Sequence, residues 1–157
     1  MALWIIELSD SAVSVFRDGR RVDSSPGVAV VDSKQVFTGT DATARQYLNP
    51  RAVHSRFWQQ LNEAQLPGAS RVCRHHADLA YHHLAAILDR CGHPNEAVIA
   101  VPAHYESNEL ALLLAICGAL KLKVSGFVDV NVAALSAAAP QGNYRVADLY
   151  LHHATLT

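Results

Sequence analysis

Short apolar runs separated by turn-forming residues fill the first quarter of the chain. Four runs share this pattern: residues 3–8, 13–16, 27–31 and 35–38. Ser9-Asp10-Ser11 lies between the first two runs, and Asp18-Gly19 marks a second tight turn. Apolar, β-branched runs bounded by such residues are typical of short antiparallel strands. We therefore predict a β-meander over the first 38 residues.

After the meander, apolar residues recur at the three- and four-residue spacing of helices. Helices are predicted at residues 40–48, 70–91, 108–120 and 131–139, with strands at residues 97–101, 124–128 and from Arg145 onward. Ser70 is the predicted N-cap of the longest helix. Strands separated by helices imply crossover connections and a partly parallel sheet. The predicted fold is α/β: a mixed sheet with an antiparallel N-terminal meander, parallel βαβ crossovers and helices on both faces.

Composition and charge exclude several classes of protein. The chain has 157 residues, of which half are hydrophobic and 17% are charged, as expected of one globular domain and not of a disordered chain. The formal net charge is −1 and no run of Lys and Arg forms a basic stripe, which argues against nucleic-acid binding. The longest uncharged apolar run, residues 110–120, is shorter than the roughly 20 residues of a membrane-spanning helix.

Cysteine usage favours a reducing, cytoplasmic compartment. Cys73, Cys91 and Cys117 form no CxxC pair and would leave one thiol unpaired in any disulfide scheme. The first residues also lack the charged segment and the long apolar core of a signal peptide. We therefore expect free thiols and a cytoplasmic location.

One segment in the second half of the chain resembles a known family. Residues 97–105, Ala-Val-Ile-Ala-Val-Pro-Ala-His-Tyr, resemble the strand ending in Val-Pro-Ala that precedes a helix in the 70 kDa heat-shock chaperones. The segments 117–120, 124–128 and 133–138 are similar in order and spacing to those that follow in these proteins, as are residues 26–50 to their early strands. Over nearly its whole length the chain thus resembles the first lobe of the actin-like ATPase superfamily, which implies a ribonuclease H-like fold.

The N-terminal hairpin pattern recurs near the C-terminus. Residues 6–15, with Glu7 in the first strand, are echoed by residues 147–157, with Asp148 in the corresponding place. The resemblance implies that each lobe opens with such a hairpin and that the two hairpins grip the nucleotide phosphates. On this basis residues 1–144 are the first lobe, and residues 145–157 are the start of the second lobe's first hairpin or the closing strand of a single lobe.

The two phosphate-binding loops that the resemblance implies have lost their glycines. The family's first loop, Asp-Leu-Gly-Thr-Thr, corresponds to residues 7–11, and its second, Asp-Leu-Gly-Gly-Gly-Thr, corresponds to residues 148–153, Asp-Leu-Tyr-Leu-His-His. Glycine lets backbone N–H groups approach a phosphate, and Asp10 places a negative charge where a phosphate would sit. If nucleotide binding is retained, the resemblance implies these residues: Glu7, Ser9, Asp10, Ser11, Arg56 and Asp148.

We therefore expect a degenerate chaperone-like or actin-like lobe that acts as an interaction or scaffold module without efficient ATP hydrolysis. No catalytic residue, metal ligand or cofactor is assigned, although the resemblance implies ATP and Mg²⁺. Two alternatives stay open. One is an active ATPase in which Glu7 and Asp148 hold a hydrated metal ion, and the other is a two-metal ribonuclease H-like enzyme using Glu7, Asp129 and Asp148. The nearly neutral charge counts against the second.

Two helices carry unusual side chains. Residues 110–120 have no polar face, which indicates either burial within the lobe or contact with a protein partner or a second copy. Leu110, Leu113 and Leu114 are the expected interface residues, and we predict self-association. On the 70–91 helix, His75, Asp78 and His82 share one face, and His76 and His83 share its neighbour. We interpret these as a solvated polar face and not as a zinc site.

Overall fold

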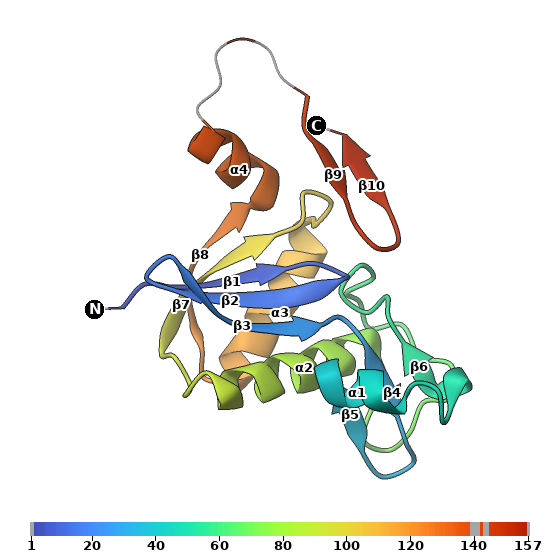
Figure 1. The fold of residues 1–157 in the computed structure, drawn as a ribbon. Helices are drawn as coiled ribbons and strands as arrows, with labels where there is room; N and C mark the ends of the chain where they lie inside the picture. Colours follow the sequence, from blue (N-terminus) through green and yellow to red (C-terminus); the bar gives the residue numbers. More distant parts are fainter. Residues whose placement is uncertain (1, 139–141, 143–144, 157) are drawn as a thin grey trace.

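A computed structural model describes residues 2–138, 142 and 145–156 of the chain (Figure 1). The strands are β1 (Trp4–Leu8), β2 (Ala12–Arg17), β3 (Arg20–Pro26), β4 (Ala29–Val31), β5 (Val36–Thr38), β6 (Val53–His54), β7 (Glu96–Val101), β8 (Lys123–Asp129), β9 (Ala147–Leu149) and β10 (Ala154–Leu156). The helices are α1 (Gly39–Arg45), α2 (His76–Arg90), α3 (Ser107–Ala119) and α4 (Val130–Ala138), with a 3₁₀ turn at Pro50–Ala52. The fold is α/β, as predicted.

The main sheet has five strands in the order β3-β2-β1-β7-β8. β1 pairs antiparallel with β2, and β2 with β3, whereas β1 pairs parallel with β7, and β7 with β8. Glu7 in β1 lies opposite Ser14 in β2 and Ala100 in β7. The mixed sheet is therefore confirmed, and β1 lies between β2 and β7.

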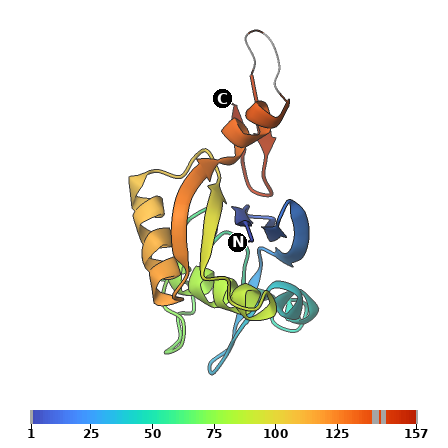
Figure 2. The same cartoon turned by 90° about the vertical axis from the view of Figure 1, so that its left-hand side faces the viewer.

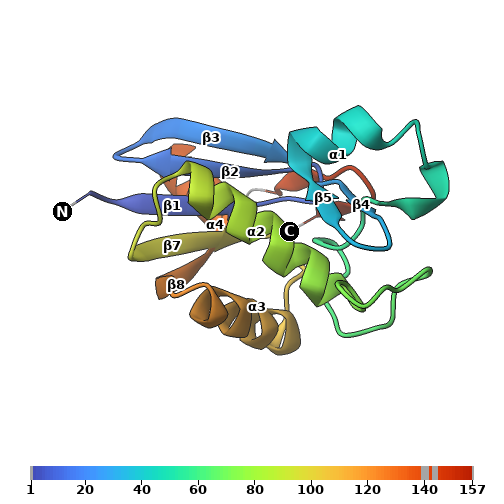
Figure 3. The ribbon, with the colours of Figure 1, turned by 90° about the horizontal axis from the view of Figure 1, so that it is seen from below.

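Alternation along the strands sorts the sheet residues onto two faces. Ile6, Leu8 and Ile99 belong to the buried set on one face, and helices α2 and α3 pack there through residues such as Leu84 and Leu113. Figures 2 and 3 show both long helices on this side of the sheet. Burial of these apolar side chains is the main stabilising contribution to the fold.

The opposite face of the sheet carries Ile5, Phe16 and Val98, all only partly buried. α4 follows the carboxyl end of β8 (Figure 1), and most of its side chains are exposed. The expectation of helices on both faces is therefore not met by the described residues, because no described helix forms a second packed layer.

The strand β3 and the start of α2 differ from the sequence prediction. β3 was not predicted, since residues 20–26 are mostly polar; it is an exposed edge strand, where one side of the strand needs no apolar pattern. α2 begins at His76 and not at Ser70, whose hydroxyl accepts the N–H groups of Val72 and Cys73 in a preceding turn. The carboxylate of Asp78 instead accepts the His75 N–H at the helix start.

β4, β5 and β6 form a second small antiparallel sheet, and β9 and β10 form a separate hairpin. In the hairpin, Asp148 lies opposite Thr155, so the predicted repeat of a hairpin pattern near the C-terminus is confirmed. Figure 1 places its turn near the turn between β1 and β2. Ala139 and Thr157, the ends of two predicted elements, fall outside the described residues.

Candidate functional site

The two hairpin turns meet at Asp10, whose side chain is almost fully buried. One carboxylate oxygen, Oδ1, accepts the backbone N–H of Leu151 at 2.9 Å, and Oδ2 accepts that of His152 at 2.8 Å. A buried carboxylate needs such donors, and hydrogen bonds to an ionised acceptor are the stronger kind. Asp10 therefore fastens the β9–β10 turn to the β1–β2 turn.

Gly27 makes the Asp10 turn possible. A Cβ atom added at Gly27 would lie 2.2 Å from the backbone oxygen of Asp10, far inside van der Waals contact. The Gly27 N–H also donates to the Ser11 carbonyl at 2.9 Å. Because Gly27 has no side chain, the segment after β3 can pack directly against the turn.

The two neighbouring histidines of the second turn point to different partners. His152 Nε2 lies 3.1 Å from the Ser55 carbonyl oxygen. His153 Nε2 lies 3.0 Å from Nδ1 of His104, in the loop after β7, and its Nδ1 lies 3.9 Å from Oδ2 of Asp10. The two adjacent side chains therefore contact different segments of the chain.

The ring of His153 packs against the rings of Tyr150 and His104. The Tyr150 ring stacks on His153 with a centroid distance of 4.1 Å and an interplanar angle of 4°. His104 meets His153 edge to face at a centroid distance of 4.3 Å. Burial, and then the neighbouring His153, lower the pKa of His104. Burial, and then Asp148, raise the pKa of the Tyr150 hydroxyl. Both shifts favour the neutral forms of His104 and Tyr150.

The structure brings together only some of the residues expected at a nucleotide site. Ser9 and Ser11 flank Asp10, and their hydroxyl oxygens lie 2.9 Å apart. Glu7 is half-buried on the uncovered face of the sheet, and Asp148 lies on the inner side of the second hairpin. Arg56 is exposed beside Ser55. Within the described ranges, no group of three His, Cys, Asp or Glu is arranged to hold a metal ion.

The second turn corrects one expectation about the missing glycines. We expected the bulky residues 148–153 to keep backbone N–H groups away from an anion. The N–H groups of Leu151 and His152 do face the centre of the site, but Asp10 already occupies them. The Leu151 side chain points outward and is largely exposed. A carboxylate of the chain itself therefore occupies these two donors.

A second polar network lies in the core, where the sequence predicted a solvated face. His83 is fully buried. Its Nδ1 accepts the indole N–H of Trp58 at 2.9 Å, so its Nε2 carries the hydrogen and donates to the Ser25 hydroxyl at 2.8 Å. Burial lowers the pKa of His83 to about 3. The prediction for His83 was wrong, and its spacing of four residues from Leu79 and Ile87, both buried, is the signal that could have revealed it.

The Ser25–His83 pair has the contact distance of a nucleophile and its general base, but not the required surroundings. A catalytic histidine donates its second N–H to a carboxylate or carbonyl that stabilises the charged ring. Here the second nitrogen of His83, Nδ1, accepts a hydrogen bond from the indole N–H of Trp58. Both Ser25 and His83 are also buried away from solvent. The network is therefore structural, and it joins β3, α2 and the loop before α2.

The other histidines of α2 are partly exposed, as interpreted from the sequence. His75 Nδ1 lies 3.5 Å from Asp78 Oδ2, and His82 Nε2 lies 3.3 Å from the Val72 carbonyl. His76 Nδ1 lies 3.0 Å from Oδ1 of Asn62. These contacts tie the helix start to the preceding loop.

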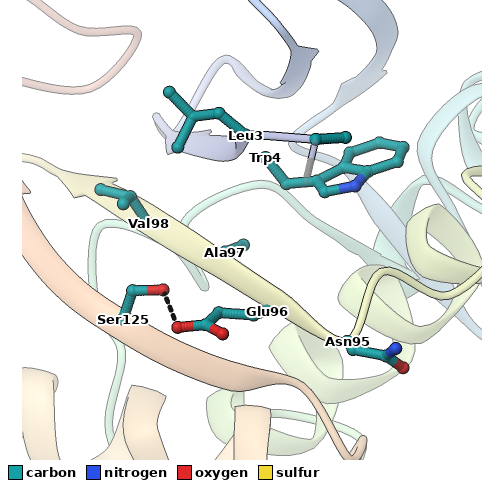
Figure 4. Close-up of a pocket in the computed structure, with 8 residues that line it drawn as sticks. Leu3, Trp4, Asn95, Glu96, Ala97, Val98 and Ser125 are labelled. Atoms are coloured by element: carbon teal, nitrogen blue, oxygen red, sulfur yellow. Dashed lines mark hydrogen bonds between the residues drawn. The ribbon is translucent and has the colours of Figure 1, made fainter.

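A cavity of about 320 Å³ lies at the amino-terminal ends of β7 and β8 (Figure 4). It is lined in part by Leu3, Trp4 and Val98. The Glu96 carboxylate at its floor accepts the Ser125 hydroxyl at 2.7 Å and pairs with Lys123 at 3.1 Å, and these contacts lower the pKa of Glu96. In open α/β sheets, ligands bind at the carboxyl ends of the strands, opposite to this cavity. The contacts of Glu96 with Ser125 and Lys123 are therefore structural, because they join β7 to β8.

Helix α3 is less exposed than its composition indicated. Leu113 is fully buried and Leu110 is half-buried against the core, so neither forms an open surface. Leu114 is 51% exposed and points outward. Of the three expected interface residues, Leu114 is the one whose side chain is available to a partner.

The sequence matches no family model and no curated protein. In the part of the chain that the structure describes, none of the helices combines the length and the apolar character needed to cross a membrane. The three cysteines are unpaired, as expected from the sequence.

Proposed function

We propose that the protein is a degenerate lobe of the actin-like ATPase superfamily, similar to the first lobe of the 70 kDa heat-shock chaperones. In this proposal it acts as an interaction or scaffold module without efficient ATP hydrolysis. The observation that carries the proposal is the pair of hydrogen bonds from the Leu151 and His152 N–H groups to the buried Asp10 carboxylate.

The arrangement of the strands supports the family part of the proposal. The resemblance predicts that the first strand lies between its antiparallel hairpin partner and the strand that ends in Val-Pro-Ala, and β1 lies between β2 and β7. It also predicts that two hairpin turns, each with an acidic residue in its first strand, face a common centre. The turns of β1–β2 and β9–β10 meet through Asp10.

The charge at the centre supports the loss of activity. Backbone N–H groups that converge at a turn attract anionic oxygen atoms, and a phosphate would use them. Asp10 belongs to the same chain as these N–H groups, so its effective concentration at the turn is high. A free anion must displace it in order to bind there. A phosphate placed there would also meet the negative charge of Asp10. We therefore expect nucleotide to bind weakly and the lobe to act through its surfaces.

The two enzymatic alternatives lack a supporting observation. A two-metal reaction needs acidic residues that converge on one pair of ions. Glu7 is half-buried on the sheet, and the carboxylate of Asp129 accepts the N–H groups of Asn131 and Val132 at the start of α4. Over the described ranges these residues and Asp148 do not form a metal-binding group.

Calorimetric titration of Mg²⁺-ATP into the unmodified chain tests the proposal. We expect no saturable heat up to millimolar nucleotide, and no ATP turnover above background in a phosphate-release assay. A dissociation constant in the micromolar range, or steady turnover, would overturn the proposal and favour the active ATPase.

A further inference from the structure

Few contacts hold the hairpin β9–β10 onto the lobe. Among the described strands, β9 and β10 pair only with each other, and an isolated two-stranded hairpin is marginally stable in water. The described contacts to the lobe lie at its turn and are polar or aromatic: Leu151 and His152 N–H to Asp10, His152 to Ser55, and the His104 ring to His153 and Tyr150. Docking of the hairpin therefore depends on the protonation states of this small set.

The hydrogen bond between His153 and His104 can form only while at most one of the two rings is charged. A neutral imidazole has one donor and one acceptor nitrogen, whereas a charged imidazole has two donors. His153 Nε2 and His104 Nδ1 are 3.0 Å apart, so one nitrogen must accept the proton that the other donates. If both rings are charged, two N–H groups face each other and the hydrogen bond becomes a repulsion between like charges.

The surroundings make the second protonation of the pair less favourable than the first. Asp10 Oδ2 lies 3.9 Å from His153 Nδ1, so a single positive charge on the histidine pair has a carboxylate beside it. A second charge, on His104, is opposed by burial and by the charged His153, and these effects lower the pKa of His104. The titratable groups that face the pair from the surrounding elements are Asp10, Tyr105, Glu109, Asp129, Asp148, Tyr150 and His152.

We infer that the His104–His153 pair makes the hairpin β9–β10 a pH-sensitive latch, which stays docked while at most one of the two imidazoles is charged and opens when both are charged. Opening frees the Leu151 and His152 N–H groups and exposes the inner side of the hairpin, including Tyr150. This inference does not depend on nucleotide binding, because it concerns only contacts within the chain.

Hydrogen exchange measured by NMR on the full chain without nucleotide tests the latch. Leu151 and His152 are the reporters, and the Ile99 N–H in β7 reports on the core. Below the pH at which the second proton binds, opening should rise by about tenfold per pH unit, after correction for intrinsic exchange, because one proton is linked to it. Ile99 should stay more strongly protected than Leu151 and His152 between pH 7.5 and 5, and its protection should follow only the stability of the whole fold.

Two variants identify the proton that opens the latch. His104→Asn keeps a polar group near the Nδ1 position but cannot become charged, and His153→Gln does the same near Nε2. Each should keep Leu151 and His152 protected at pH 5, whereas His82→Gln, on α2, should open like the unmodified chain. Equal protection of the unmodified chain at both pH values, or opening of both latch variants at the same pH as the unmodified chain, would overturn the inference.

Discussion

The Asp10 carboxylate and the backbone N–H of His152 lie 2.8 Å apart, although 142 positions separate the two residues in the chain. This hydrogen bond, with its neighbour from Leu151, links the first hairpin of the protein to the last one described. Since the acceptor is charged and buried, its partners cannot be removed without cost. The predictions below follow from this contact, from the buried His83 and from the exposed surface of α3.

Replacing Asp10 by Ala should release the second hairpin while the main sheet stays folded. The change leaves two backbone N–H groups without an acceptor, a loss of about 1–3 kcal/mol in hairpin docking. Hydrogen exchange at pH 7 should show loss of protection at Leu151 and His152, with β1 and β7 unchanged. Asp89→Ala, on the exposed surface of α2, is the control. Unchanged protection of the hairpin would contradict this role of Asp10.

The block to nucleotide should lie at Asp10 and not at Ser9. Asp10→Gly removes the competing carboxylate and frees the two N–H groups, so Mg²⁺-ATP or inorganic phosphate should bind more tightly than to the unmodified chain. Ser9→Gly leaves the carboxylate in place and should not improve binding. Calorimetric titration of the two variants side by side decides the point, and equal affinities would show that Asp10 is not the obstacle.

Acid should destabilise the fold through His83. The pKa of His83 is lowered to about 3 in the folded state, so unfolded chains bind a proton below about pH 6.5 that folded chains do not. The stability contribution is complete above pH 6.5 and is lost as the pH falls toward 3. At pH 5 the loss is roughly 2 kcal/mol for this one group, from about 1.4 kcal/mol per pH unit.

Urea unfolding at pH 7 and pH 5 measures this loss. Burial also lowers the pKa of His54, His76 and His104, so the unmodified chain should lose more than the share of His83. His83→Gln should be less stable at pH 7, because it disturbs the bonds to Trp58 and Ser25, but should lose less stability on acidification. The same pH dependence in both proteins would mean that His83 is not buried in its neutral form.

Gly27→Ala should destabilise the protein, whereas Gly118→Ala should not. The new Cβ at position 27 would collide with the backbone of Asp10, at a cost of about 1–3 kcal/mol or more from forced backbone shifts. A Cβ at position 118, on α3, meets no atom within 4 Å and should stabilise the helix by about 0.5–1 kcal/mol. Thermal unfolding of both variants tests the pair, and equal effects would argue against the close approach at Gly27.

Self-association should depend on Leu114. We expect the unmodified chain to associate at tens of micromolar, since Leu114 offers exposed apolar surface. Leu114→Glu should give soluble, folded monomers, and His75→Glu should leave association unchanged. Leu113→Glu should instead unfold the protein, because it buries a charge in the core. Light scattering that reports a monomer for the unmodified chain would end this proposal.

Local sequence patterns determined most of the secondary structure. The strands β1, β2 and β7 were predicted because apolar residues gather in short runs between turn formers, and α3 because a polar cap precedes a long run of helix formers. The hairpin near the C-terminus was predicted from its likeness to the first one. β3 was missed because an edge strand with polar residues carries no apolar pattern that marks it.

The site was decided by tertiary structure. The sequence singled out Asp10 as a negative charge in a phosphate position. It did not reveal that the Asp10 carboxylate accepts the N–H groups of Leu151 and His152, because every residue except proline carries the same backbone donor. The burial of His83 depends likewise on Trp58 and Ser25, which lie 25 and 58 positions away. Local periodicity follows from the geometry of a helix or strand, whereas a polar contact between distant segments exists only once the chain has folded and excluded water from both partners.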